Sequence, residues 1–260
     1  EDLKDKCVVV TGATGGVGSA VAQAFAELGA RVLVVDLKED ALKDLISGLP
    51  GTGHDIYPLD LSALDKQRAL FDHAQTMGGL QALAHCAAVL RRRSTVDEVT
   101  EEDWDFQLDT NLKSTFFLNR TARDVMKANG TKGAIVNFSS QGWWTGGFGG
   151  SVVYAASKGG IVSMTRGLAR DWGVDRIRVN TVVPGWVMTE RQIKLWLGAD
   201  GERQIFENQC LKDKLYPPDI ARMVLWLAAD DSRMVTAQDF VVDEQDGIGA
   251  PVGMTGARLE

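Results

Sequence analysis

A glycine-rich segment near the start of the sequence limits the possible folds of this chain more than any other feature. The short apolar run Cys7–Thr11 predicts a buried strand, and Gly16–Leu28 places apolar residues at the spacing of a helix. The segment that joins them, Thr11–Gly18, reads TGATGGVG. A buried strand that passes through such a turn into a helix is typical of the first βα unit of a dinucleotide-binding sheet.

Each glycine in this turn has a distinct expected task. Gly12 permits the tight turn, Gly16 lets the backbone approach a pyrophosphate, and Gly18 lets the helix pack against the sheet. Thr14 and Val17 lie in the same turn and are expected contacts of the cofactor. The free N–H groups at the start of the helix then face the phosphates, and the helix dipole favours their negative charge.

Short apolar runs alternate with longer helical patterns along the rest of the chain. Further strands are predicted at Arg31–Asp36, Ile56–Leu59, Leu80–His85, Ala134–Phe138, Ile177–Val183 and Phe240–Val242. Helices are predicted at Ala41–Ile46, Leu64–Met77, Tyr154–Trp172 and Pro218–Ala229, with a long one capped by Thr100 and running to about Ala128. This alternation predicts an α/β fold. We expect a single doubly wound Rossmann domain over residues 1–243, with a mostly parallel seven-stranded sheet and helices on both faces, and an irregular tail at 244–260.

Two acidic residues follow predicted strands where the adenosine of a cofactor would lie. Asp36 ends the second strand, and a carboxylate there accepts hydrogen bonds from ribose hydroxyls and repels a 2′-phosphate. The next residue is Leu37 rather than a basic residue, so the pattern favours NAD over NADP. Asp60 and Leu61 follow the third strand and are expected contacts of the cofactor. The Asp60 carboxylate is a candidate for the adenine amino group, with an ordinary loop acid as the alternative.

A tyrosine and a lysine one helical turn apart indicate acid–base chemistry. Tyr154 and Lys158 lie on one face of a predicted helix. A free phenol has a pKa of about 10, and a neighbouring ammonium together with a positive nicotinamide would favour its ionised form. Ser140 follows the fifth strand, at the sheet edge where open α/β folds bind ligands. Its hydroxyl is suited to hold a substrate oxygen while the tyrosine exchanges the proton.

With these segments in place, the chain resembles the short-chain dehydrogenase/reductase family from about Leu3 to Asp243. The matching segments are Thr11–Gly18, Asp36, Asp60, Asn111 in DTNL, IVNFSS at 135–140, YAASK at 154–158 and VPGWVMT at 183–189.

The resemblance implies a role for each matching residue. Ser140 would orient the substrate oxygen, and Tyr154 would be the acid and base. Lys158 would lower the pKa of the tyrosine and bind the nicotinamide ribose, and Asn111 would hold a water of the proton relay. It further implies a homotetramer formed through the helices that contain Asn111 and Tyr154. Other cofactor contacts implied by the resemblance are Ala87, Pro184, Gly185, Val187 and Thr189.

The sequence departs from the family at two places. Where the family usually reads Asn-Asn-Ala-Gly, residues 85–88 read His-Cys-Ala-Ala. The imidazole of His85 is expected to replace an amide as a structural hydrogen-bonding group, with a catalytic role as the alternative. The family tends to end its last strand with a glycine turn, whereas Asp243 precedes Glu244-Gln245-Asp246, so the expected arm after this strand cannot be carried over.

The segment at about 185–215 is the expected substrate lid, and it resembles that of bacterial sugar dehydrogenases that oxidise C1 to a lactone. Polar groups suit the hydroxyl rim of a sugar, and aromatic rings suit its C–H face. Packing of the lid is the alternative role of the aromatics. Alternative functions are a polyol or secondary-alcohol dehydrogenase, a 3-oxoacyl reductase, and a non-catalytic NAD-binding sensor. The candidate substrate residues are Trp143, Trp186, Arg191, Gln192, Trp196 and Gln209.

The composition argues against other classes of protein. A net charge of −7 disfavours nucleic-acid binding, and no apolar run approaches the length that spans a membrane. The 3 cysteines show no disulfide or zinc spacing, which favours the cytoplasm, and the histidines show no metal-ligand spacing. The basic run Arg91–Arg93 is interpreted as a solvated loop, with an anionic substrate or a subunit contact as alternatives.

Overall fold

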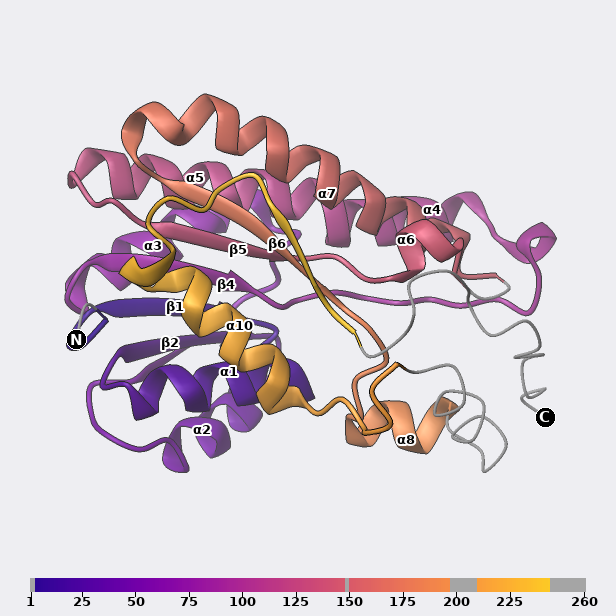
Figure 1. Ribbon diagram of the computed structural model, residues 1–260, viewed down its shortest axis with the longest axis horizontal. Helices are drawn as coiled ribbons and strands as arrows, with labels where there is room; N and C mark the ends of the chain where they lie inside the picture. The colour runs from indigo at the N-terminus through magenta and orange to yellow at the C-terminus, as the bar shows by residue number, and fades with distance from the viewer. Residues whose placement is uncertain (1–2, 148–149, 197–209, 244–260) are drawn as a thin grey trace.

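The fold is known from a computed structural model that describes residues 3–147, 150–196 and 210–243, without the side chains of residues 195 and 196 (Figure 1). In this part of the chain, seven strands form one sheet in the order β3-β2-β1-β4-β5-β6-β7. Every neighbouring pair is parallel, which confirms the predicted doubly wound fold. The strands are β1 Cys7–Thr11, β2 Arg31–Asp36, β3 Asp55–Pro58, β4 Leu80–His85, β5 Ala134–Phe138, β6 Arg178–Pro184 and β7 Asp239–Val242.

Helices cover both faces of the sheet (Figure 1). One face carries α1 (Gly16–Glu27), α2 (Glu39–Ser47) and α10 (Pro217–Ala228). The other carries α3 (Gln67–Thr76), α5 (Ser114–Ala128) and α7 (Val152–Trp172). No helix in the described ranges is long and apolar enough to cross a membrane.

Alternation along each strand divides the core between these two faces. In β1, Val8 and Val10 pack with α1 and α10, while Cys7 and Val9 pack with α3 and α5. All four side chains are fully buried. Because successive side chains of a strand point to opposite faces, a strand covered on both faces must be apolar throughout. This is why the strands appear in the sequence as short continuous apolar runs.

The long helix predicted from Thr100 to Ala128 is not uniform, and this prediction was wrong in its middle. It begins as α4 (Glu101–Leu108) with the predicted capping box between Thr100 and Asp103. A π-helical segment follows at Asp109–Lys113 before α5 begins. The hydroxyls of Ser114 and Thr115 donate to the carbonyls four residues earlier, and such bonds compete with the regular helical ladder.

Two short helices lie in segments for which no helix was predicted. They are α6 (Gly142–Thr145), after β5, and α8 (Glu190–Trp196), after β6. With four and seven residues, both are too short to show a clear helical period in the sequence. Both follow the carboxyl ends of strands, so they stand at the edge where an open sheet binds its ligands.

Candidate active site

The turn after β1 is closely packed against the loop after β4. Gly12 has a φ of +62°, and a Cβ atom there would lie 2.7 Å from the Cα atom of Ala87. A Cβ at Gly18 would collide with the carbonyl oxygen of Gly12. No side chain caps the start of α1, so its first N–H groups remain for a ligand. These features fit the pyrophosphate of a dinucleotide, as the sequence predicts.

A cleft of about 330 Å³ opens at the point where the strand order reverses between β1 and β4. Such a switch point is where doubly wound sheets bind nucleotides. Six predicted cofactor residues line it together: Gly12, Thr14, Asp36, Asp60, Leu61 and Ala87. Sequence reasoning missed Val89 and Thr110, and it placed Arg191 among the substrate residues although its side chain lines this cleft.

Asp36 lies at the end of β2 and faces the glycine turn. Its carboxylate accepts hydrogen bonds from the backbone N–H of Thr14 at 3.0 Å and from the Thr14 hydroxyl at 2.6 Å. Asp60 instead accepts bonds from Ser62, two residues further on, and so also closes its own loop. The Asp36 carboxylate is therefore fixed beside the glycine turn, at the end of the cleft formed by β2.

The remaining predicted cofactor residues lie around the start of α1 and the end of β6. Gly16, Val17 and Gly18 form the first turn of α1. The methyl group of Thr189 would lie 2.8 Å from a Cβ at Gly16, so the segment after β6 closes against the glycine turn. Pro184 ends β6, Gly185 follows it, and Val187 is buried.

His85 is a buried bridge between strand ends and the π-helical segment. Its Nδ1 lies 2.7 Å from the hydroxyl oxygen of Thr11, and its Nε2 lies 2.8 Å from that of Thr115. The Thr115 hydroxyl donates its own proton to the carbonyl of Asn111, so the Thr115 hydroxyl oxygen accepts a hydrogen bond from Nε2–H of His85. The ring is thus neutral, with Nδ1 accepting from Thr11. Burial, with a smaller effect of the Lys158 charge, lowers the pKa of His85 to about 3.

Asn111 holds the loop that follows β4. Its amide donates to the carbonyl of Val89 and accepts from the backbone N–H of the same residue, both at 2.8 Å. A second amide N–H donates to the hydroxyl of Ser157 at 3.3 Å. The wider π-helical turn therefore presents this side chain to the loop and to α7 at once. Its expected role as holder of a relay water stays a prediction.

Lys158 is buried on α7, beside β5. Its Nζ donates to the carbonyl of Phe138 at 2.8 Å and lies 5.5 Å from the ring centroid of Tyr154. Burial lowers the pKa of this ammonium to about 8. The neighbour Ser139 donates its hydroxyl proton to the carbonyl of Lys158, so it anchors α7 to the sheet.

Tyr154 and Ser140 lie near one another at the sheet edge. Burial of the phenol raises the pKa of Tyr154, while a hydrogen bond with Ser140 and the charge of Arg191 lower it. The Ser140 oxygen also accepts from the backbone N–H of Gly142, which fixes its position over α6. Two hydroxyls fixed in this way can hold one substrate oxygen and exchange its proton.

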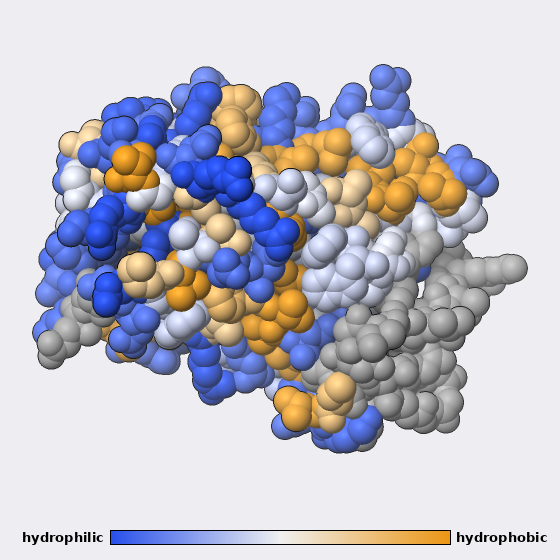
Figure 2. Space-filling model, turned by 45° about the horizontal axis from the view of Figure 1, so that its top comes forward, coloured by the Kyte–Doolittle hydropathy of each residue, from blue (hydrophilic) through white to orange (hydrophobic). Residues whose placement is uncertain are grey.

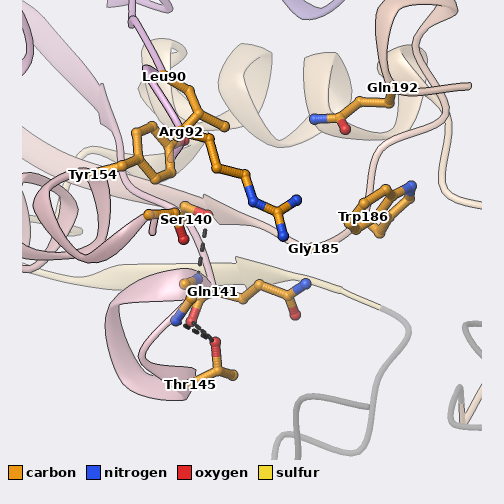
Figure 3. A pocket seen from close by; sticks show the side chains of 12 residues that line it. Leu90, Arg92, Ser140, Gln141, Thr145, Tyr154, Gly185, Trp186 and Gln192 are labelled. Carbon is orange, nitrogen blue, oxygen red and sulfur yellow. Dashed lines mark hydrogen bonds between the residues drawn. The ribbon is translucent and has the colours of Figure 1, made fainter. Parts of the chain in front are cut away.

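A cavity of about 120 Å³ opens in front of this pair (Figure 3). Of the predicted substrate residues, Trp186 and Gln192 line it. Trp143 does not line it, because its side chain packs against α7 at Gly159. Trp196 ends α8 but its side chain is not described, and Gln209 lies outside the described residues. Two further residues of the wall, Arg92 and Gln141, were not among the predicted substrate residues. For Arg92, contact with an anionic substrate was an alternative interpretation of the basic run.

Comparisons with known proteins agree with this geometry. The family model for enoyl-(acyl carrier protein) reductase matches residues 12–244. The chain is 37% identical to a probable galactose dehydrogenase of Rhizobium meliloti over 93% of this chain and 95% of that protein. It is also 37% identical to a D-xylose 1-dehydrogenase of Caulobacter vibrioides, with the same coverage. A crystal structure of a putative short-chain alcohol dehydrogenase from Sinorhizobium meliloti superposes with a TM-score of 0.85 at 28% identity, over 94% of this chain and 96% of that one.

The fold, the glycine turn and the serine–tyrosine–lysine group define a nicotinamide-dependent oxidoreductase that acts on CH–OH groups of small molecules. The chain belongs to the short-chain dehydrogenase/reductase family, as the predicted resemblance stated.

Proposed function

We propose that the protein oxidises an aldose at C1 to a lactone with NAD. The observation that carries this proposal is the small cavity in front of the Ser140–Tyr154 pair, which combines polar side chains with the indole of Trp186. Hydrogen bonds around a rim and an aromatic wall suit a polyhydroxylated ring. The names of the galactose and D-xylose 1-dehydrogenase relatives support the same substrate class.

The proposed roles of the catalytic residues follow from their places. Ser140 holds O1 of the sugar and the ionised Tyr154 receives its proton, because both side chains line the same cavity. The bound nicotinamide ring accepts the hydride. Lys158 supplies a positive charge beside the phenol and binds the nicotinamide ribose. Asn111 supports this group by fixing the loop at Val89.

The proposed cofactor is NAD rather than NADP. The Asp36 carboxylate is fixed by Thr14 at the adenosine side of the cleft. A ribose with free hydroxyls can donate to this carboxylate, whereas a 2′-phosphate would meet a like charge. The neighbouring Leu37 side chain is exposed and brings no positive charge to offset that repulsion.

We also propose a homotetramer, working in the cytoplasm, that is built through α7 and through the helical run α4–α5 that contains Asn111. An apolar hollow lies on this side of the molecule, and apolar patches interrupt the hydrophilic surface of the face shown in Figure 2. Such a patch supports a subunit contact. The free thiols Cys7, Cys86 and Cys210 support a reducing compartment. The hollow is lined by Leu108, Leu112, Phe116, Phe117 and Met164, with Asp109 and Lys113 at its edge.

The test is to measure the formation of NADH, by its absorbance, with a panel of aldoses, polyols and secondary alcohols as substrates. We expect turnover of aldoses with NAD and much weaker turnover with NADP, and a lactone as the product. Oxidation of polyols or simple alcohols alone would refute the aldose proposal while keeping the acid–base residues. Binding of NAD without turnover of any substrate class would favour a sensor.

A further inference from the structure

Three consecutive arginines, Arg91 to Arg93, lie beside the cavity and make different contacts. Arg91 and Arg93 both pair with Asp103, whose side chain is only 1% exposed. The Arg93 guanidinium makes two bonds of 2.7 Å to the two carboxylate oxygens, and that of Arg91 adds one of 3.3 Å. The run is a loop, as predicted, but it is braced by a buried carboxylate, and the side chains of Arg91 and Arg93 stay only partly exposed. Arg92, between these two, lines the cavity with Ser140 and Tyr154 (Figure 3).

The backbone of this run is fixed relative to the catalytic helix. The N–H of Arg93 donates to the carbonyl of Gly150, just before α7, at 3.4 Å. A Cβ at Gly150 would collide with the Arg93 carbonyl, so the two segments are in close contact. The N–H of Arg91 donates to the buried side chain of Gln107 at 3.0 Å. The Arg92 guanidinium is consequently held on a braced segment rather than on a loose loop.

The other described residues of the cavity wall carry no formal charge, and the charge of Arg191, which lines the neighbouring cleft, also acts on Tyr154. Among the described lining residues, Arg92 carries the only formal charge, and the other polar groups are hydroxyls, amides and an indole. A guanidinium presents five N–H donors in a planar fork that matches the two oxygens of a carboxylate. One positive charge balances a carboxylate monoanion, whereas a phosphate dianion calls for further cations or a nest of backbone N–H groups.

We infer that the preferred substrate is an aldose that carries a carboxylate, that is, a uronic acid, with its carboxylate on Arg92 and its C1 hydroxyl on Ser140 and Tyr154. This inference rests on the proposed aldose oxidation and adds the charge of the substrate. The C1–H bond breaks, its hydride passes to NAD, and the proton of O1 passes to the ionised Tyr154 oxygen, which becomes a neutral phenol. The ring carbon becomes the lactone carbonyl, and the carboxylate is unchanged.

Two matched sugar series separate the effect of the carboxylate from that of the ring. D-Galacturonate, D-galactose and L-arabinose share their ring configuration and differ only in the group on C5, as do D-glucuronate, D-glucose and D-xylose. We expect kcat/KM with NAD to be highest for an acid in at least one series. Arg92→Leu should lower the ratio of kcat/KM for the acid to that for its pentose by about tenfold to a hundredfold, the range for a hydrogen-bonded charge.

The controls separate recognition from folding. Arg68→Leu removes the same charge from an exposed site on α3 and should leave the ratio unchanged. Arg92→Gln keeps polar atoms without the charge and should lower the ratio as well, which serves if the leucine variant folds poorly. Arg92→Lys keeps the charge without the fork and should retain part of the preference. Thermal unfolding of each variant shows whether the fold is intact.

Each contrary result has a distinct meaning. If the wild type prefers the neutral sugars and Arg92→Leu leaves the ratio unchanged, the inference is overturned while the proposed function stands. If galactose 6-phosphate is oxidised better than either uronate, the carboxylate is the wrong anion and the inference also fails. If a small 3-hydroxy acid is oxidised and no sugar is, both the inference and the proposed function fail.

Discussion

The buried His85 makes the stability of this protein depend on pH in a way that can be calculated. Its ring is neutral in the folded state, where burial lowers its pKa from 6.5 to about 3. Below pH 6.5 the unfolded chain binds a proton that the folded chain does not, so the free energy of unfolding falls as the pH falls. The loss is about 1.4 kcal/mol per pH unit and ends near the folded pKa.

The perturbation is His85→Asn, which restores the residue type that the family usually has. Between pH 7 and pH 4.5 the wild type should lose about 2 to 3 kcal/mol more free energy of unfolding than the variant, because two pH units lie below 6.5. Urea unfolding followed by tryptophan fluorescence, at one protein concentration and without cofactor, gives both values.

A second variant separates titration from hydrogen bonding. His85→Leu also lacks the titrating group, so its pH dependence should match that of His85→Asn. At pH 7 it should be less stable by a further 1 to 3 kcal/mol or so, because the Thr11 hydroxyl loses its acceptor in a buried place. If both variants lose as much stability as the wild type between pH 7 and pH 4.5, the histidine is not a buried neutral bridge.

Three further substitutions test other parts of the site. Tyr154→Phe should lower kcat by about 10²- to 10⁴-fold while NAD still binds, as measured by calorimetry, because it removes the proton acceptor; unchanged kcat would exclude the tyrosine. Asp36→Ala should raise kcat/KM with NADP relative to NAD at least about tenfold, since it removes the like charge, and an unaltered ratio would mean that Asp36 does not select the cofactor. Gly12→Ala should lower the free energy of unfolding by about 1 to 3 kcal/mol and weaken NAD binding, because the φ of +62° and the contact with Ala87 both oppose a Cβ; full stability in urea would contradict this packing.

The features that the sequence predicted well are those set by local pattern. Apolar runs and helical spacing define the strands and the main helices, since a doubly covered sheet needs apolar strands. The glycines after β1 and the serine after β5 were placed at one sheet edge because parallel strands share their carboxyl end. That reasoning brings Gly12, Asp36 and Asp60 into one cleft without any knowledge of tertiary contacts.

The features that it did not predict depend on contacts between distant segments. Arg91–Arg93 reads as a solvated run, whereas in the fold Arg91 and Arg93 contact the buried carboxylate of Asp103 on α4 and Arg92 lines the cavity. Arg191 and Trp143 were assigned to the substrate from their neighbours in the sequence. In the fold Arg191 lines the cleft beside the glycine turn, from which its charge still acts on Tyr154, and Trp143 packs against α7.

The proposed activity is the transfer of the C1 hydrogen of a sugar to NAD at this site. The most direct measurement uses D-galactose labelled with deuterium at C1, with mass spectrometry of the reduced cofactor and NMR of the sugar product. We expect one deuterium in each NADH, an equal amount of lactone, and loss of both signals in Tyr154→Phe. Reduced cofactor without deuterium, or a sugar oxidised at another carbon, would contradict the proposed activity.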